Sequence, residues 1–171
     1  LISLSWLKQQ NNTTASLNYT GDFVLVLSNS ALCRIEGFII GNNSLGSGLL
    51  TRGICMQNEI CHNYLINCSN NLVLSDYSHS NLVSRNIITN GLRYNINTKS
   101  RASNTIIYSN FIATAGDDCL DLDGPGNLVM SNYITDSSQR GIMFNDVDAI
   151  GSSIIYNRIE NNGLAGIRIS G

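Results

Sequence analysis

The strongest constraint on this chain is a repeated tripeptide in which asparagine or glycine is followed by any residue and then by isoleucine or leucine. Its six copies begin at Gly37, Asn63, Asn86, Asn110, Asn132 and Asn157. The intervals between them are 26, 23, 24, 22 and 25 residues. One unit of about 24 residues cannot bury its apolar face alone, whereas stacked copies share one continuous core. The sequence therefore predicts a solenoid.

A second apolar pair follows each later copy of the tripeptide, and its members are separated by one residue. The pairs are Leu72/Leu74, Tyr94/Ile96, Leu120/Leu122, Ile142/Phe144 and Ile167/Ile169. This alternation indicates short strands, and the Asn, Gly and Ser residues between them indicate turns. The composition agrees, because 24 Asn, 21 Ser and 21 Ile stand against two Lys, and none of the three is a strong helix former. An all-β chain is expected.

Leucine-rich repeats share this period, but their L-x-x-L-x-L-x-x-N pattern and helical half are absent. Three short strands and three turns per coil describe a parallel β-helix. On this pattern the chain resembles the right-handed parallel β-helix (pectin lyase-like) superfamily over residues 30–171. The resemblance implies about six to seven coils in a single domain spanning residues 1–171. Residues 1–29 are expected to be irregular or to form a first coil, with a strand at Phe23–Leu27.

The asparagines of the repeat fall in one column of the predicted solenoid. In a turn, Asn tolerates the left-handed backbone conformation, and its side-chain amide can bond the equivalent Asn one coil away. Such a ladder satisfies buried backbone groups of the turn. We therefore interpret Asn63, Asn86, Asn110, Asn132 and Asn157 as a structural Asn ladder.

Charge and hydropathy exclude several partners. The formal net charge is −2, with 10 Lys and Arg against 12 Asp and Glu. A nucleic-acid partner is not expected, because such binders carry a clear basic excess. No apolar run reaches the roughly 18 residues that a membrane-spanning helix needs, so no membrane span is expected. The sequence leaves the oligomeric state open.

The acidic residues concentrate in one coil and its successors. Asp117, Asp118, Asp121 and Asp123 fall close together, and Asp136, Asp146 and Asp148 follow. Alignment of the last three coils gives three columns: Asp118, Arg140 and Ala165; Asp121, Met143 and Arg168; and Asp123, Asn145 and Gly171. Because the alternating leucines point inward, Asp121 and Asp123 are expected to face outward, and Asp118 is expected to be exposed on its turn. Like charges raise one another's pKa, which suits a general acid near neutral pH.

The run Gly116-Asp117-Asp118-Cys119 looks like the G-D-D-C motif of the polygalacturonase family of glycoside hydrolases. In that family the two acids take part in inverting hydrolysis, and an Arg of a later R-I-K motif binds the uronate carboxylate. Arg168 matches that Arg, whereas Arg140 stands where the family has histidine and Ser170 where it has lysine. No acid occupies the place of the family's N-T-D carboxylate, near Asn90. The resemblance implies an acidic-polysaccharide site on this surface.

Other chemistries have weaker sequence support. Asp118, Asp121 and Asp123 could hold Ca²⁺ through oxygen ligands, as in calcium-dependent lyases, although no cofactor is required by the pattern. Cys61-His62 lies near Cys55 and Cys68, but the spacing lacks a C-x₂-C pair, so no metal site is predicted and buried thiols are favoured. The five cysteines are an odd number, which leaves at least one thiol without a partner in this chain.

The sequence thus favours a carbohydrate-active enzyme that binds and cleaves an extracellular, acidic polysaccharide, as a glycosidase or a lyase. Asp118 is the expected general acid, Asp117 or Asp121 the base, and Arg168 the group that binds a substrate carboxylate, with Asp123 and Arg140 as further substrate-binding residues. The alternative is a non-catalytic structural or adhesive segment, such as a tailspike shaft or part of a surface protein. At the level of the family, either function places the protein outside the cell or on a cell or virion surface.

Overall fold

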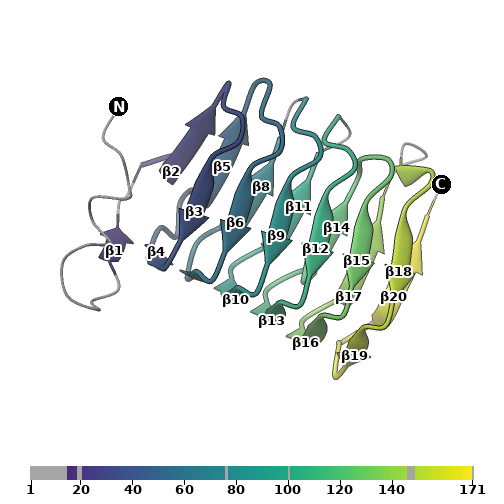
Figure 1. Ribbon diagram of the computed structural model, residues 1–171. Helices are drawn as coiled ribbons and strands as arrows, with labels where there is room; N and C mark the ends of the chain where they lie inside the picture. The colour runs from purple at the N-terminus through teal and green to yellow at the C-terminus, as the bar shows by residue number, and fades with distance from the viewer. Residues whose placement is uncertain (1–14, 19–20, 76, 100, 146–148, 171) are drawn as a thin grey trace.

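The computed structural model describes residues 15–18, 21–75, 77–99, 101–145 and 149–170. These residues form an all-β solenoid of about six turns, in which three parallel sheets run along the stack. Figure 1 shows successive coils lying side by side, from the first coil at one end to the last coil at the other. The predicted fold class, a parallel β-helix, is confirmed.

Each coil contributes one strand to each sheet, except that the last described coil has no strand in the third sheet. The first sheet contains β1 (Ala15–Asn18), β4 (Phe38–Gly41), β7 (Tyr64–Ile66), β10 (Ile87–Gly91), β13 (Phe111–Ala115), β16 (Tyr133–Ser137) and β19 (Arg158–Glu160). The second contains β2 (Phe23–Ser28), β5 (Ser47–Arg52), β8 (Asn70–Leu74), β11 (Tyr94–Thr98), β14 (Leu120–Leu122), β17 (Arg140–Phe144) and β20 (Ala165–Ile169). The third contains β3 (Arg34–Glu36), β6 (Glu59–Cys61), β9 (Leu82–Ser84), β12 (Ile106–Tyr108), β15 (Leu128–Met130) and β18 (Ser153–Ile155).

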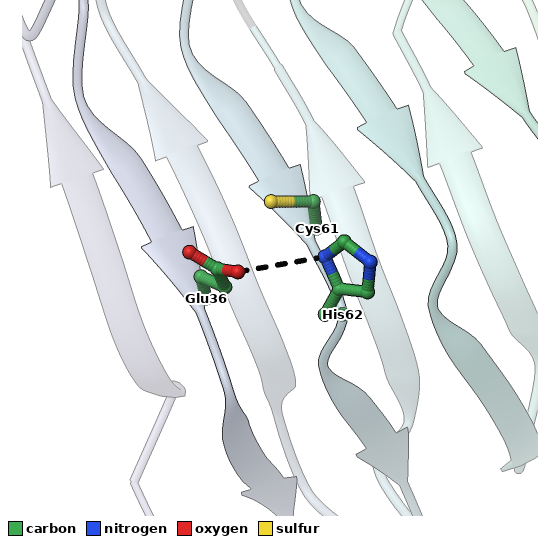
Figure 2. A group of neighbouring side chains, drawn as sticks. All are labelled: Glu36, Cys61 and His62. Atoms are coloured by element: carbon green, nitrogen blue, oxygen red, sulfur yellow. Dashed lines mark ion pairs between the residues drawn. The ribbon is translucent and has the colours of Figure 1, made fainter. Parts of the chain in front are cut away.

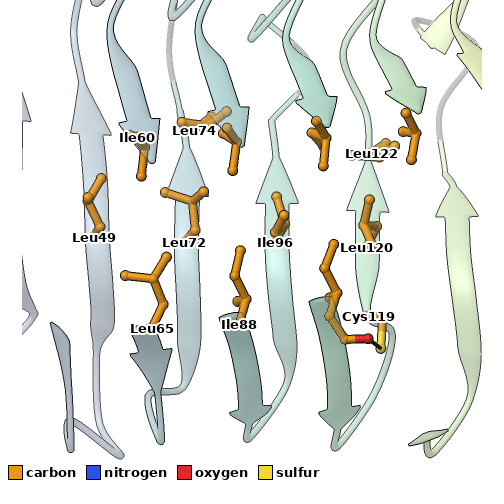
Figure 3. Packing of buried hydrophobic residues seen from close by; sticks show 14 of the residues in the cluster. Leu49, Ile60, Leu65, Leu72, Leu74, Ile88, Ile96, Cys119, Leu120 and Leu122 are labelled. Atoms are coloured by element: carbon orange, nitrogen blue, oxygen red, sulfur yellow. Dashed lines mark hydrogen bonds between the residues drawn. The ribbon is translucent and has the colours of Figure 1, made fainter. Parts of the chain in front are cut away.

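The core is built from apolar columns, one residue per coil, that run inside the stack (Figure 3). In the second sheet the register pairs Leu72 with Ile96, Ile96 with Leu120, and Leu120 with Ile142. All four side chains are fully buried. The strand predicted at Phe23–Leu27 exists as β2 and pairs with β5, so this segment already belongs to the coils.

The Asn ladder is confirmed. The side-chain oxygen of Asn110 accepts hydrogen bonds from the backbone N–H and the amide of Asn86, at 2.9 and 3.0 Å. The amide of Asn110 donates to the side-chain oxygen of Asn132 at 3.0 Å and to the carbonyl of Val83 at 2.9 Å. Every buried amide in this column is therefore both donor and acceptor, as a buried polar group requires.

The left-handed conformation, however, belongs to the residue before each ladder asparagine rather than to the asparagine itself. Its φ angle is 54° at His62, 55° at Arg85, 53° at Ser109 and 56° at Ser131. The turn needs one left-handed residue to change direction, and the asparagine that follows stays in a conformation that directs its amide along the stack. The prediction was right about the hydrogen bonds and wrong about the backbone.

The cysteines behave as the sequence analysis favoured. All five thiols are free, and Cys55, Cys61, Cys68 and Cys119 are buried, while Cys33 is half-buried. No helix in the described part of the chain has the length and apolar character needed to cross a membrane.

Candidate functional site

The register brings the predicted acidic residues together on the outer side of the second sheet. Leu120 pairs with Ile142, so Asp118 lies beside Arg140, and Asp121 pairs with Met143, which in turn pairs with Arg168. The first two predicted columns are therefore correct. The third was shifted by one residue, because Phe144 pairs with Ile169 and the residue beside Asn145 is Ser170.

Not every predicted acid belongs to this surface. Asp136 lies on β16 of the first sheet and is exposed. Asp146, Asp148 and Gly171 lie outside the described residues. We use the name acidic face for the remaining group on β11, β14 and β17 and in the turns beside β14, which consists of Tyr94, Asp117, Asp118, Asp121, Asp123 and Arg140.

Asp118 is buried rather than exposed, with a relative accessibility of 1%. Its carboxylate accepts a hydrogen bond from the backbone N–H of Arg140 at 2.9 Å and forms an ion pair with the Arg140 guanidinium at 3.2 Å. Burial raises the pKa of Asp118, and Arg140 opposes that rise. The expectation of an exposed acid was wrong because the Arg140 side chain of the next coil covers it.

Asp121 is also covered, with a relative accessibility of 3%. Its two carboxylate oxygens accept hydrogen bonds from Asn97 of the preceding coil, at 2.6 Å, and from Asn145 of the following coil, at 2.5 Å. Burial, followed by the nearby charges of Asp123 and Asp118, raises the pKa of Asp121 to about 7. In the sequence analysis we named only like-charge repulsion as a cause of such a shift, whereas burial is the larger cause.

The rest of the acidic face surrounds these two carboxylates. Asp117 is half-buried, and its Oδ1 atom is shielded from solvent without a hydrogen-bond partner. Burial, followed by the charges of Asp121 and Asp117, raises the pKa of Tyr94. The Arg93 guanidinium stacks over the Tyr94 ring, 5.0 Å from its centroid.

Arg168 lies farther from the acids than its proposed role requires. It is exposed on β20, and Met143 separates it from Asp121 along the column. Two other exposed cations, Arg93 and Lys99, lie at the ends of β11, and the charge of Lys99 lowers the pKa of Asp121. Cations therefore flank the acidic face at several positions.

The predicted Ca²⁺ ligands do not converge. Among the described residues, one group of three potential metal ligands brings its ligand atoms within 4.8 Å of one another, and it consists of Glu36, Cys61 and His62 rather than the aspartates. Figure 2 shows the Glu36 carboxylate directed toward the His62 ring, with the Cys61 sulfur beside them. The distance from Glu36 Oε1 to His62 Nδ1 is 3.6 Å.

Sequence reasoning missed the partners that lie one coil away. Asn97 precedes Asp121 by 24 residues, and Glu36 precedes Cys61 by 25 residues, so each spacing equals one repeat period. A search at that period would have found both pairs.

No protein-family model matches the chain, and no curated protein matches it in sequence.

Proposed function

We propose that this protein binds and hydrolyses an acidic polysaccharide at the acidic face. The proposal depends chiefly on Asp121, a carboxyl group whose pKa of about 7 leaves a substantial protonated fraction at neutral pH. A general acid works best when its pKa lies near the working pH, and such catalysis contributes roughly 10²–10⁴-fold in rate. This assignment moves the role of acid from Asp118 to Asp121.

Asp118 and Arg140 take a positioning role in this proposal. The Asp118 carboxylate is paired with Arg140, so this carboxylate is not available to move a proton. In return, Asp118 fixes the Arg140 guanidinium at the edge of the face, where an N–H group can meet a substrate carboxylate. Arg93, Lys99 and Arg168 supply the exposed positive charge that an acidic chain needs beside so many aspartates.

Glycoside hydrolysis requires an acid and a base on either side of the scissile bond. Asp121 gives its proton to the glycosidic oxygen as the bond to the anomeric carbon breaks. Asp117, the half-buried carboxylate of the same face, takes a proton from the water that attacks this carbon. The products are two shorter chains, and the proton on Asp117 returns to Asp121 through solvent. Asn145 is exposed, so a sugar can displace its amide from Asp121 without disturbing the core.

The chemistry of the face favours hydrolysis over elimination. A calcium-dependent lyase needs carboxylates that converge on the cation, which the described aspartates do not, whereas a carboxyl group with a pKa of about 7 suits the acid that hydrolysis requires. A polysaccharide substrate implies a location outside the cell or on a cell or virion surface.

The test is a screen of acidic and neutral polysaccharides with the purified protein. New reducing ends without unsaturated products are expected, and Asp121→Asn should lower the rate by a factor of about 10² or more. Asp136→Asn is the matched control, because it neutralises an exposed acid on the first sheet and should change nothing. Unsaturated products would indicate a lyase. If no substrate is bound or cleaved, the result would support the alternative function, a non-catalytic structural or adhesive solenoid.

A further inference from the structure

We propose that Glu36, Cys61 and His62 form a binding site for a divalent transition metal and that Zn²⁺ is the ion it binds. This site lies two or more coils from the aspartates of the acidic face and does not depend on the polysaccharide proposal. Thiolate, imidazole and carboxylate groups are the ligands that Zn²⁺ takes in proteins, and three protein ligands leave the fourth tetrahedral position open.

The distances fit such an ion. Zn²⁺ lies about 2.0–2.1 Å from nitrogen and oxygen ligands, so two such ligands of a tetrahedral ion are about 3.3 Å apart. The Glu36 Oε1 to His62 Nδ1 distance is 3.6 Å, and the Cys61 sulfur lies within 4.8 Å of both atoms. Side-chain rotations that draw the three ligand atoms closer together would bring them to bonding distance (Figure 2).

The backbone of two neighbouring coils places the three ligands. Glu36 ends β3 and Cys61 ends β6, and the parallel register pairs these two residues directly. His62 follows in the left-handed conformation, with φ of 54°, which turns its ring toward the preceding coil. The residue at the equivalent position of that coil is Gly37, where an added Cβ would meet nothing within 4 Å. The space that His62 needs is therefore open.

A neighbouring cation orients the carboxylate. The Arg34 Nε donates to Glu36 Oε2 at 2.9 Å, which leaves Oε1 directed toward His62. Arg34 also pairs with Glu59 at 3.2 Å. Second-shell partners of this kind are typical of metal sites.

The ligand set distinguishes among metals. A thiolate ligand favours Zn²⁺ and other soft or borderline ions over Ca²⁺ and Mg²⁺, which prefer oxygen. The Cys61 thiol is 1% exposed and the His62 side chain is 44% exposed, so the ion would lie at the surface with its sulfur ligand shielded. His62 also lines an open surface pocket of about 440 Å³ with Tyr64 and Ile87.

The alternative is an ion pair between Glu36 and protonated His62 without any metal. Calorimetric titration of the reduced, metal-free protein with ZnCl₂ separates the two, and CoCl₂ provides an optical probe, because a cobalt–thiolate bond gives a charge-transfer absorption. We expect one ion per chain and a cobalt–thiolate band. Cys61→Ser and His62→Asn should each weaken Zn²⁺ binding by more than about 100-fold, beyond the 10–100-fold that loss of a second-shell partner costs. Asn is chosen at 62 because it tolerates the left-handed backbone.

The controls are Cys33→Ser, which removes the most exposed thiol, and His79→Asn, which removes the other histidine. Both should bind Zn²⁺ as the parent does. A melting temperature for each variant without metal shows that it is folded. The proposal is wrong if the parent shows no saturable Zn²⁺ binding, if Cys61→Ser keeps the parent affinity, or if the cobalt complex lacks the thiolate band.

Discussion

Two columns of buried polar side chains run through the same coils of this solenoid, and their side chains are hydrogen-bonded in different ways. In the Asn ladder, Asn110 accepts from Asn86 and donates to Asn132, so a neutral amide satisfies both neighbours. In the second sheet, Asp121 occupies the equivalent middle place between Asn97 and Asn145, but it only accepts. An amide at position 121 could hold the column together without charge.

The difference indicates which polar groups serve the fold and which serve another purpose. A buried carboxylate is costly unless it is paired or protonated, and Asp121 is bonded by two neutral amides rather than by a cation. Its raised pKa means that the folded state resists ionisation of this group. The charge is therefore not explained by packing, which is why we place Asp121 at the centre of the functional proposal.

The largest effect is expected when a carboxylate is placed in the neutral column. Asn110→Asp removes the donor to Val83 and Asn132 and buries a charge, so we expect a loss of about 4 kcal/mol or more in the free energy of unfolding at pH 7. Urea denaturation measures it. Asn90→Asp is the matched control, because Asn90 is exposed, and should change stability by less than about 0.5 kcal/mol. Equal effects at the two positions would contradict the account of the ladder.

The reverse substitution should stabilise the protein. The folded-state pKa of Asp121 is raised to about 7 from 3.8, so its contribution to stability is fully present below pH 4 and is lost as the pH rises to 7. Asp121→Asn should therefore raise the free energy of unfolding at pH 8 by roughly 2–4 kcal/mol and have little effect at pH 4. Unfolding of both proteins across this pH range measures the effect. A variant that is less stable at pH 8 would show that the charge serves the fold.

A substitution at Arg140 tests the buried carboxylate of Asp118, which is paired with a cation, unlike that of Asp121. Arg140→Leu leaves Asp118 buried without its guanidinium, and we expect a loss of about 2–3 kcal/mol at pH 8. The loss should shrink at acid pH, where Asp118 becomes protonated. The double variant with Asp118→Asn should recover much of the stability, and a purely additive double variant would mean that the two side chains do not interact.

The smallest change in stability is expected at Asp117, which is half-buried and carries no ion pair in the described contacts. Asp117→Asn should alter the free energy of unfolding by less than about 1 kcal/mol. If Asp117 is the base, the same variant should lose a factor of about 10² or more in polysaccharide hydrolysis. Unchanged turnover would remove Asp117 from the mechanism.

The sequence predicted the fold well because every coil repeats the same constraints. The tripeptide period located the ladder, and the alternating leucines located the core side of β14, since both patterns depend only on spacing. It predicted the site less well. Burial of Asp118 depends on the Arg140 side chain of another coil, and burial of Asp121 depends on Asn97 and Asn145. Such contacts need the exact register, which single motifs do not contain.

The ionisation of Asp121 is the most direct test of the contrast between the two columns. The carboxyl carbon of Asp121 can be followed by ¹³C NMR as a function of pH in labelled protein, with Asp121→Asn to assign the signal. We expect a titration midpoint near pH 7, far above the ordinary 3.8. A midpoint near 4 would show that the two asparagines stabilise the charged form fully, and Asp121 would then be a structural member of its column.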